Sequence, residues 1–366
     1  MNKRFLMLPI ILSILMLSVL CSCQQKEGTT GPEKKKLKVA FVYVSPVGDA
    51  GWTFSHDRAR KEMEKELDFV ETTYMESVSE GSDAERIFTG LCEKGYKLIF
   101  GTSFGYMDSM ENVAKKYPDV VFMHCSGYKT SSNLGTYFGR IEEPRYLSGL
   151  VAGKMTEVNK IGYVAAHPIP EVVRGINAFT LGVRKVNPKA TVHVVWTYTW
   201  FDPGKEKEAA SSLLDTGVDV IAQHQDTSAP QQAAEAKGVY SVGYNCDMSS
   251  FAPQAHLTAP VWNWTPFYIK TAKEVYNGTW KTGSYWEGMK AGVVDLSPLG
   301  AMVPEDVKNI VEKEKEDIIA GKYKIFAGPI KDQQGKEKVA KGKELTDEEL
   351  LEMNWFVEGV EGKVSK

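Results

Sequence analysis

The sequence lacks the motifs of the common nucleotide-binding and metal-dependent enzymes. No Gly-rich phosphate loop with its Lys, and no G-x-G-x-x-G dinucleotide motif, follows the first apolar segment, LKVAFVY. The six histidines show neither H-E-x-x-H nor any other spacing typical of metal ligands. These absences argue against an enzyme, and we expect no cofactor and no bound metal.

An excess of positive charge is also absent. The 366 residues include 44 Lys and Arg against 47 Asp and Glu, which gives a formal net charge of −3. A protein that binds nucleic acid neutralises phosphates with a basic surface, so we expect no nucleic-acid partner. The hydrophobic fraction, 43%, is that of a globular protein, and the length suggests about two domains.

The N-terminal apolar run is too short to be a membrane span. The basic start MNKR precedes LMLPIILSILMLSVL, which falls short of the roughly 20 apolar residues that cross a bilayer. The polar stretch QQKEGTTGPEKKK follows soon after, as it does behind a secretory signal. We therefore predict a signal peptide over residues 1–22 and a flexible tether over residues 23–36.

The end of this signal resembles the cleavage site of a bacterial lipoprotein. Leu20-Cys21-Ser22-Cys23 fits the pattern Leu-x-small-Cys with Cys23 as the lipidated residue. A lipid on Cys23 would hold the body at the outer face of the cell membrane, in the periplasm or on the cell surface, without a transmembrane helix. A plain signal peptide that is cut nearby is the alternative.

Few cysteines remain once this segment is set aside. The body contains only Cys92, Cys125 and Cys246, with no C-x-x-C pair. Disulfide frameworks usually have an even and denser set of cysteines. We expect buried free thiols, and a single disulfide is the alternative.

The body alternates between strand-like and helix-like segments. Short apolar runs such as LKVAFVY, YKLIFG and DVVFMHC are separated by amphipathic segments, and the alternation repeats in two blocks, roughly 37–145 and 146–246. Continuous apolar runs of this length are typical of parallel strands covered on both faces. The pattern predicts an α/β protein of two Rossmann-like lobes.

After residue 246 the pattern continues, so we expect the chain to cross back between the lobes. The expected N-terminal lobe comprises residues 37–146 and about 247–277. The expected C-terminal lobe comprises residues 147–246 and about 278–366. Near the end, Thr346 and Glu349 have the spacing of a capping box at the start of a helix.

Aromatic and polar side chains gather where these strands end. The carboxyl ends of parallel strands form the edge of the ligand crevice in such sheets. The aromatic candidates are Trp52, Phe104, Trp200, Trp262 and Trp264, and the polar ones are Asp226, Asn245 and Asp247. Two facing aromatic rings could hold a flat ring between them, and the polar groups could read its edge. Each residue also has a structural alternative, namely loop packing for the rings and helix caps or Asx-turns for the polar groups.

Six segments of the body are distinctive, namely DAGWT, GTSFGYMD, TWFDPG, QHQDTS, GYNCDM and LTAPVW. In these segments the chain resembles the basic membrane lipoprotein family of substrate-binding proteins, which includes purine nucleoside receptors. The family has the type I periplasmic-binding-protein fold, in which two α/β lobes close on a ligand about a hinge. Its members are lipid-anchored components of ABC importers, so the resemblance implies ABC permease subunits as partners.

The resemblance also implies roles for individual residues. Trp52 and Trp200 stand at the positions of the family's two stacking rings, and Phe104 stands at a position in its pocket. Asp226 or a neighbour stands at a position that contacts the purine base of the ligand. Asn245 and Trp262 stand where the nucleoside receptors have an Asp and a Lys that are implied to hold the ribose. A Trp in place of that Lys would fill the space of the sugar. We therefore hypothesise that the ligand is a free purine base or a similar flat heterocycle, bound by a monomer.

Other readings stay open at this point. The ligand could be a purine nucleoside or a sugar, since aromatic platforms also stack on sugars. The same fold and anchor would suit a ligand sensor or a surface protein. An enzyme that acts on a heterocycle is a further alternative.

Overall fold

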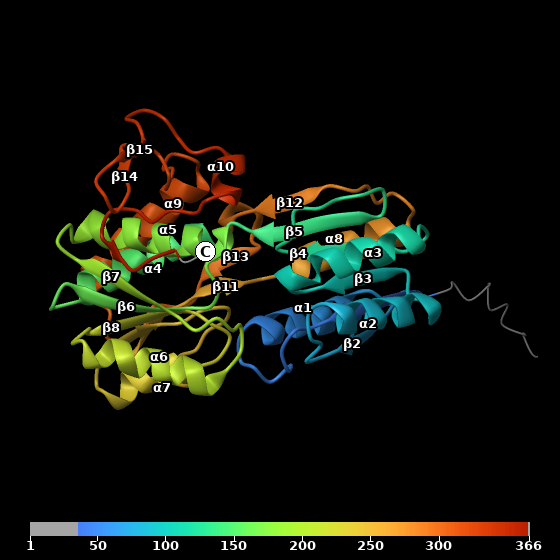
Figure 1. Ribbon diagram of the computed structural model, residues 1–366, viewed down its shortest axis with the longest axis horizontal. Helices are drawn as coiled ribbons and strands as arrows, with labels where there is room; N and C mark the ends of the chain where they lie inside the picture. Colours follow the sequence, from blue (N-terminus) through green and yellow to red (C-terminus); the bar gives the residue numbers. More distant parts are fainter. Residues whose placement is uncertain (1–35, 365–366) are drawn as a thin grey trace, which may run out of the picture. The chain divides into compact units, whose positions relative to one another are not determined.

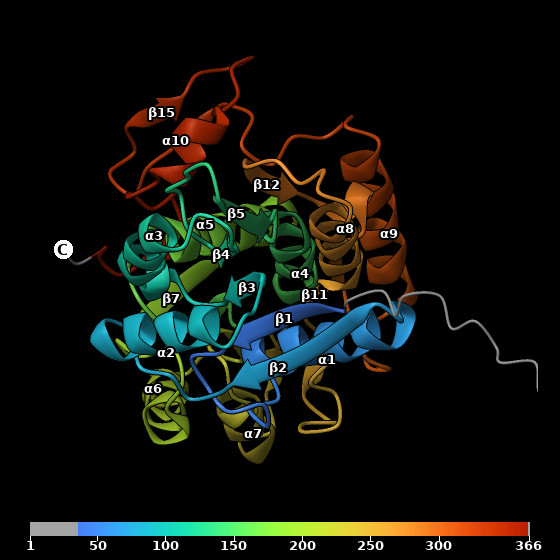
Figure 2. The same ribbon diagram turned by 90° about the vertical axis from the view of Figure 1, so that its right-hand side faces the viewer.

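The computed structural model describes residues 36–364. The predicted signal peptide, the lipidation site Cys23 and all of the predicted tether except Lys36 lie outside the described residues. The described residues form one compact unit. Within it the helices of each lobe lie on both sides of a central sheet (Figures 1 and 2).

The first lobe is built on a sheet of six parallel strands. The sheet order is β12-β5-β4-β3-β1-β2. Its strands are β1 Leu37–Val42, β2 Val70–Met75, β3 Leu98–Gly101, β4 Val121–Cys125, β5 Leu134–Gly139 and β12 Ser284–Glu287, and its helices are α1 Trp52–Glu66, α2 Ser82–Glu93, α3 Met107–Lys116 and α8 Thr265–Tyr276.

The side chains of β1 show how this sheet is covered on both faces. Val39 and Phe41 pack in one cluster with residues of α1 and α8. Ala40 and Val42 pack in another cluster with residues of α2 and α3. Because successive side chains of a strand point to opposite faces, a central strand buried on both faces must be apolar throughout. The continuous apolar run read from the sequence is therefore explained.

The second lobe repeats this design. Its sheet order is β10-β9-β8-β6-β7-β16, with parallel pairing throughout. The strands are β6 Lys160–Ala165, β7 Thr191–Trp196, β8 Val220–His224, β9 Tyr240–Val242, β10 His256–Thr258 and β16 Val360–Glu361. The helices are α4 Glu142–Met155, α5 Pro170–Val186, α6 Pro203–Asp215, α7 Ala229–Ala236 and α9 Glu305–Ile319.

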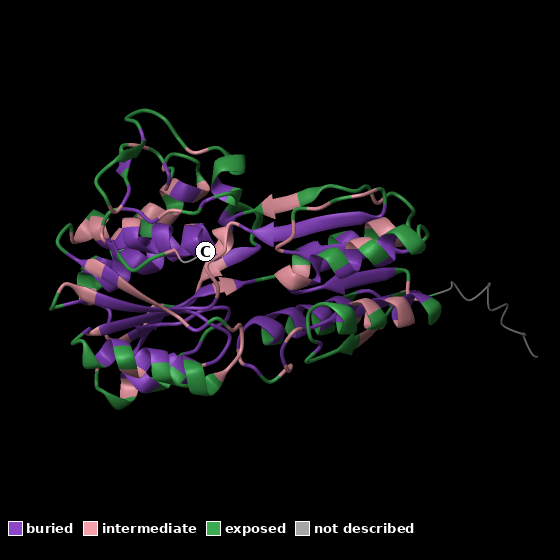
Figure 3. Ribbon diagram, in the orientation of Figure 1, coloured by how far each residue is buried: buried purple, intermediate pink, exposed green. Residues whose placement is uncertain are grey.

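Helices α4 and α5 pack closely because glycines face backbone atoms between them. A Cβ atom at Gly149 of α4 would collide with the backbone oxygen of Phe179, and one at Gly182 of α5 would collide with that of Tyr146. Helix α4 is buried along most of its length. Figure 3 shows the buried strands and the α4–α5 layer in purple.

The chain passes between the lobes three times. The first passage joins β5 to α4, the second contains β11 (Pro260–Trp262), and the third contains the 3₁₀ turn η2 (Met289–Ala291) and β13 (Val294–Leu296). Strands β11 and β13 pair antiparallel and so tie two of the passages together. These short crossing segments form the hinge of the fold.

The C-terminal segment packs on the second lobe. It contains β14 Ile330–Lys331, β15 Glu337–Val339 and α10 Asp347–Leu351 before β16 joins β7. The predicted capping box is confirmed, since the Thr346 hydroxyl accepts from the Glu349 amide and the Glu349 carboxylate accepts from the Thr346 amide.

Two short strands each belong to the opposite lobe from the one predicted for them. Residues 247–277 were expected in the first lobe, but β10 extends the second sheet beside β9. Residues 278–366 were expected in the second lobe, but β12 pairs with β5 of the first sheet. Strands of three or four residues have too little periodicity to be assigned to a sheet from sequence. The hydrogen bonds to the neighbouring strand decide their place.

Three further observations concern the described residues only. None of their helices is both long enough and apolar enough to span a membrane. Within the same residues, no cluster of His, Cys, Asp and Glu has the arrangement of a metal site. Cys92, Cys125 and Cys246 are buried free thiols, as the odd number of cysteines predicted.

Candidate functional site

A cavity of about 20 Å³ lies between the two lobes. This volume holds roughly one water molecule, so a larger ligand needs the lobes to move apart. Its lining comes from both lobes and consists of Val44, Trp52, Thr102, Ser103, Phe104, Ser126, Glu171, Trp200, His224, Asp226 and Tyr244. Most of these residues stand at or just after the carboxyl end of a strand, where α/β sheets bind ligands.

A larger hollow lies on the outer surface beside α2. It is lined mainly by side chains of that single helix, including Glu85, Arg86 and Glu93. No strand ends converge on it from two lobes, so it is not the candidate site.

Each lobe contributes an indole ring to the cavity. Trp52 is the first residue of α1, is 9% exposed, and donates from its indole Nε1 to the Thr102 backbone oxygen at 2.6 Å. Trp200 follows β7 in the other lobe and packs its ring against that of His167, with 4.9 Å between ring centres. The hydrogen bond of Trp52 and the packing of Trp200 hold both rings in place before a ligand arrives.

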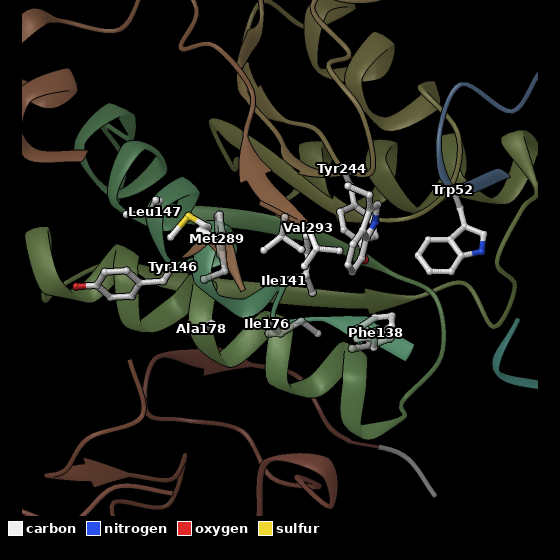
Figure 4. Close-up of a cluster of buried hydrophobic side chains, with 14 of the residues drawn as sticks. Trp52, Phe138, Ile141, Tyr146, Leu147, Ile176, Ala178, Tyr244, Met289 and Val293 are labelled. Carbon is white, nitrogen blue, oxygen red and sulfur yellow. The ribbon is translucent and has the colours of Figure 1, made fainter. Parts of the chain in front are cut away.

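Trp52 also belongs to the main hydrophobic core. Figure 4 shows Trp52 at one end of a row of buried side chains that runs past Phe138 and Ile141 to Tyr146. Tyr244 lies in the same cluster and lines the cavity, with the guanidinium carbon of Arg145 3.7 Å from its ring centre. The aromatic walls of the cavity are thus continuous with the packed interior.

The polar part of the cavity is acidic. Asp226 is buried, and this burial raises the pKa of its carboxyl well above the usual value, with smaller contributions from the charges of Asp49 and Glu206. Glu171 in the first turn of α5 lies 3.6 Å from His224, measured from Oε1 to Nε2. Burial lowers the pKa of His224 to about 4, so this ring is neutral near pH 7. No Lys or Arg is among the described residues that line the cavity.

Glu206 of α6 braces the loops that carry Trp200 and Asp226. Its carboxylate accepts from the Thr227 hydroxyl at 2.6 Å and from the Thr227 amide at 3.2 Å. The other carboxylate oxygen accepts from the Asp202 amide at 3.1 Å. Burial raises the pKa of Glu206 to about 7. Both site loops are therefore fixed by one side chain that does not itself line the cavity.

The predicted site residues separate into two groups. Trp52, Phe104, Trp200 and Asp226 line the cavity together. Asn245, Asp247, Trp262 and Trp264 do not line it.

Asp247 stands apart from the cavity. Its carboxylate accepts from the Ser249 amide at 2.9 Å, in an Asx-turn, and its side chain is 46% exposed. The turn therefore accounts for this residue without a ligand.

Trp262 and Trp264 are fully buried behind the cavity wall. Their rings stack with 4.7 Å between centres and 13° between planes. The Trp262 indole also lies edge-on to Trp52, at 5.5 Å between centres. Both rings are part of the packed interior near the hinge and face no open space of the cavity.

Several lining residues were not selected from the sequence. His224 ends β8, Tyr244 follows β9, and Glu171 opens α5. The position of His224 and Tyr244 at strand ends was an available signal, because the same rule selected Trp52 and Trp200. Glu171 gave none, since an acidic residue in the first turn of a helix is common in its own right.

The segment 101–105 has the G-x-S-x-G spacing of a hydrolase nucleophile, but Ser103 does not have the contacts of one. Its hydroxyl donates to Glu80, and His124 bonds the backbone oxygen of Ser103 instead of the hydroxyl. The Ser103 backbone is extended, with φ −140° and ψ 144°, and lacks the strained turn of a nucleophile elbow. Ser103 therefore serves as part of the cavity wall.

The lobes touch each other at the start of α1. The Ser55 hydroxyl donates to the Asn245 backbone oxygen at 2.8 Å, and the Cys246 thiol donates to the Ala50 backbone oxygen at 2.7 Å. Between these contacts Gly51 faces the backbone of Asp226, where a Cβ atom would collide with the carbonyl oxygen. The described arrangement is thus a closed one, and Gly51 is what allows it.

Comparison with known proteins identifies the family of the chain. The family model described as ABC transporter substrate-binding protein PnrA-like (Bmp) matches residues 36–328. The chain belongs to this family. It is therefore a substrate-binding protein of an ABC transporter and not an enzyme, as the resemblance of its sequence segments predicted.

Two relatives of this Bmp-family protein are similar over most of its length. A purine-binding protein of Brucella abortus (strain 2308) is 48% identical over 338 residues, which cover 92% of this chain and 96% of that protein. A protein of Haloferax volcanii, provisionally named as a glucose-binding protein of an ABC transporter, is 45% identical over 339 residues, which cover 92% of this chain and 84% of that protein.

Solved structures confirm the predicted fold. A solute-binding protein of an ABC transporter system from Aeropyrum pernix K1 superimposes with a TM-score of 0.70 at 21% identity, and the match covers 81% of this chain and 93% of that chain. The two parallel-sheet lobes and the hinge are those of the type I periplasmic-binding-protein fold. The family places this protein outside the cytoplasm, where ABC importers collect their substrates.

We predict that Gly51→Ala weakens ligand binding at least tenfold. The added methyl group would collide with Asp226 and force the lobes apart, and apparent affinity falls with the fraction of the closed form. Titration calorimetry of the purified protein would measure the loss. Gly48→Ala is the matched control, because a Cβ there has no atom within 4 Å. Equal affinities of the two variants would contradict this role of Gly51.

We predict that Glu206→Gln changes the pH dependence of stability. The folded pKa of Glu206, about 7, lies above its ordinary value of 4.5. The stabilising effect of the protonated form is therefore complete below about pH 4.5 and is lost as pH rises through 7. Because the amide cannot ionise, the variant should gain in Tm relative to the wild type between pH 5 and pH 8. The exposed residue Glu208 supplies the control, Glu208→Gln, and a pH-independent difference would refute the prediction.

Proposed function

We propose that this protein captures a purine base, or a similar flat heterocycle, for import by an ABC permease. The observation that carries the proposal is the cavity itself, whose lining has one indole from each lobe and a buried carboxyl group. Stacking of a base on an aromatic ring contributes roughly 1–3 kcal/mol per base in nucleic-acid complexes. Trp52 and Trp200 are the two stacking rings, and Phe104 borders the same space.

The charge of the lining supports a neutral ligand. Asp226 and Glu171 are acidic, and the described lining has no Lys or Arg to balance a phosphate or carboxylate. A purine base offers ring N–H groups, which carboxylates accept. Nucleotides and organic acids fit this cavity poorly on electrostatic grounds.

The residue at the position implied to hold ribose supports a base over a nucleoside. Trp262, which stands at the position of the Lys implied to hold ribose, is buried and stacked on Trp264. Its side chain therefore offers no charged group to a sugar. The similarity to the purine-binding protein of Brucella abortus supports the same class of ligand.

A sugar is the second candidate ligand. The relative from Haloferax volcanii is nearly as similar and has a provisional name that mentions glucose. An aromatic ring can stack on the apolar face of a sugar, and Asp226 and Glu171 could accept from its hydroxyl groups. This candidate differs from the first in needing no second stacking ring.

Capture occurs by closure of the lobes. Only the closed form has both rings on the ligand, so the ligand shifts the open–closed equilibrium towards that form. The closed form then docks on the permease. We further propose that Cys23 is lipidated and holds a monomer at the outer face of the membrane, with a ligand sensor on the same fold as the alternative role.

Calorimetry with adenine, guanine, hypoxanthine, their nucleosides and glucose tests this function. We expect at least one base to bind more tightly than its nucleoside and more tightly than glucose, because two indoles can stack on a base and Trp262 offers no charged group to a ribose. Tighter binding of every nucleoside than of its base would exclude the base. Binding of glucose alone would favour the second candidate.

Trp52→Ala should weaken binding of the base at least tenfold. Loss of about 2 kcal/mol of stacking corresponds to somewhat more than this factor. Affinity is again measured by calorimetry. Trp280→Ala is the control, because Trp280 is a partly buried Trp that does not line the cavity. An unchanged affinity of Trp52→Ala would remove this ring from the site.

A further inference from the structure

A chain of two hydrogen bonds leads from the hinge to the cavity. Nε1 of Trp262, in strand β11, donates to Oδ1 of Asn245 at 2.9 Å. Nδ2 of Asn245 then donates to Oδ1 of Asp226 at 3.0 Å. All three residues are buried, and only Asp226 lines the cavity.

The direction of these two hydrogen bonds is fixed by the first donor, the indole of Trp262. An indole N–H can donate but cannot accept, so the carbonyl oxygen of Asn245 must face Trp262. The amide nitrogen of Asn245 must then face Asp226. With the amide reversed, its NH₂ group would face the N–H of Trp262, so two donors would meet. Its oxygen would face Oδ1 of Asp226, so two acceptors would meet. Asp226 is therefore held with Oδ1 as an acceptor.

The other oxygen of this carboxyl group is available to a ligand. Among the described residues Oδ2 of Asp226 has no hydrogen-bond partner, while the residue borders the cavity. Burial raises the pKa of this carboxyl group because its charged form is poorly solvated, and a hydrogen bond to the charged form would favour it. A ligand N–H directed at this oxygen would supply the missing bond.

We propose that Trp262 is a positioning residue for ligand recognition, which acts through Asn245 to hold Asp226 as the acceptor of an N–H group of the bound heterocycle. This inference rests on the proposed function, since it names the edge that the base presents. It assigns Trp262 and Asn245 a role behind the site in place of direct contact with the ligand. It also explains why an Asn and a Trp occur together at these two positions.

The protein contains a matched control for Trp262. Trp264 is also fully buried and is stacked on Trp262, but its indole Nε1 has no hydrogen-bond partner among the described residues. Substitution of either Trp by Phe removes a similar volume from the same stack. Only Trp262→Phe also removes the donor to Asn245. The difference between the two variants therefore reports the hydrogen bond and not the packing.

The test is a double-mutant cycle on the full-length mature protein. The probe is whichever of adenine, guanine and hypoxanthine binds the wild type most tightly, and affinity is measured by calorimetry. We expect Trp262→Phe to weaken binding about tenfold in the wild type and less than threefold in Asp226→Ala, because its effect passes through Asp226. Trp264→Phe should have the same small effect in both backgrounds.

A second readout uses the ligand. The same base is methylated at each ring nitrogen in turn, and one of these changes should weaken binding to the wild type at least tenfold by removing the N–H that Asp226 accepts. That methyl group should matter little to Asp226→Ala. Thermal unfolding of the two Phe variants shows whether they lose similar stability, as their similar packing requires.

The outcomes separate this inference from the proposed function. Binding of a base to the wild type, with equal effects of Trp262→Phe in both Asp226 backgrounds, would overturn the relay and leave purine binding in place. Equal losses of affinity in Trp262→Phe and Trp264→Phe would do the same. Failure of all three bases to bind the wild type would overturn both proposals together.

Discussion

The site depends on the parallel direction of the strands in both sheets. In a parallel sheet all carboxyl ends meet one edge, and here the edges of the two sheets meet across the cavity. Side chains from seven separate strand ends or their loops therefore reach one small space, although they are up to 200 residues apart in the chain. The hinge, the stacked indoles and the acidic lining all presuppose this convergence.

Charge inside the cavity is governed by burial without a balancing cation. Asp226, Asp49 and Glu206 all have a raised pKa, and burial is the main cause for each. Asp49 offsets part of this cost by accepting the amides of Gly51, Thr53 and Phe54 at the start of α1. Acidic groups thus have two roles near the site. Asp49 and Glu206 accept hydrogen bonds from backbone amides, while Asp226 faces the ligand space.

The sequence predicted the fold and part of the cavity lining for identifiable reasons. The apolar runs of the central strands are long enough to show that both faces are buried, so the two lobes could be read directly. The expectation that residues just after strand ends line the cavity identified Trp52, Phe104, Trp200 and Asp226. Their place depends only on local strand position and sheet direction. It failed for Trp262 and Trp264, because their depth depends on how β11 crosses between the lobes. The sheet partners of β10 and β12 were missed for a similar reason.

The contacts between the lobes have a consequence for evolution of affinity. The bonds from Ser55 to Asn245 and from Cys246 to Ala50 are made by the protein with itself, at the rim of the closed form. Each is present whatever the ligand is, so each changes the closing free energy by the same amount for every ligand. About 1.4 kcal/mol there corresponds to a factor of ten in binding strength. Substitutions at these contacts can therefore change the affinity of the protein during evolution. They would not change which ligand it selects, because they do not contact the ligand.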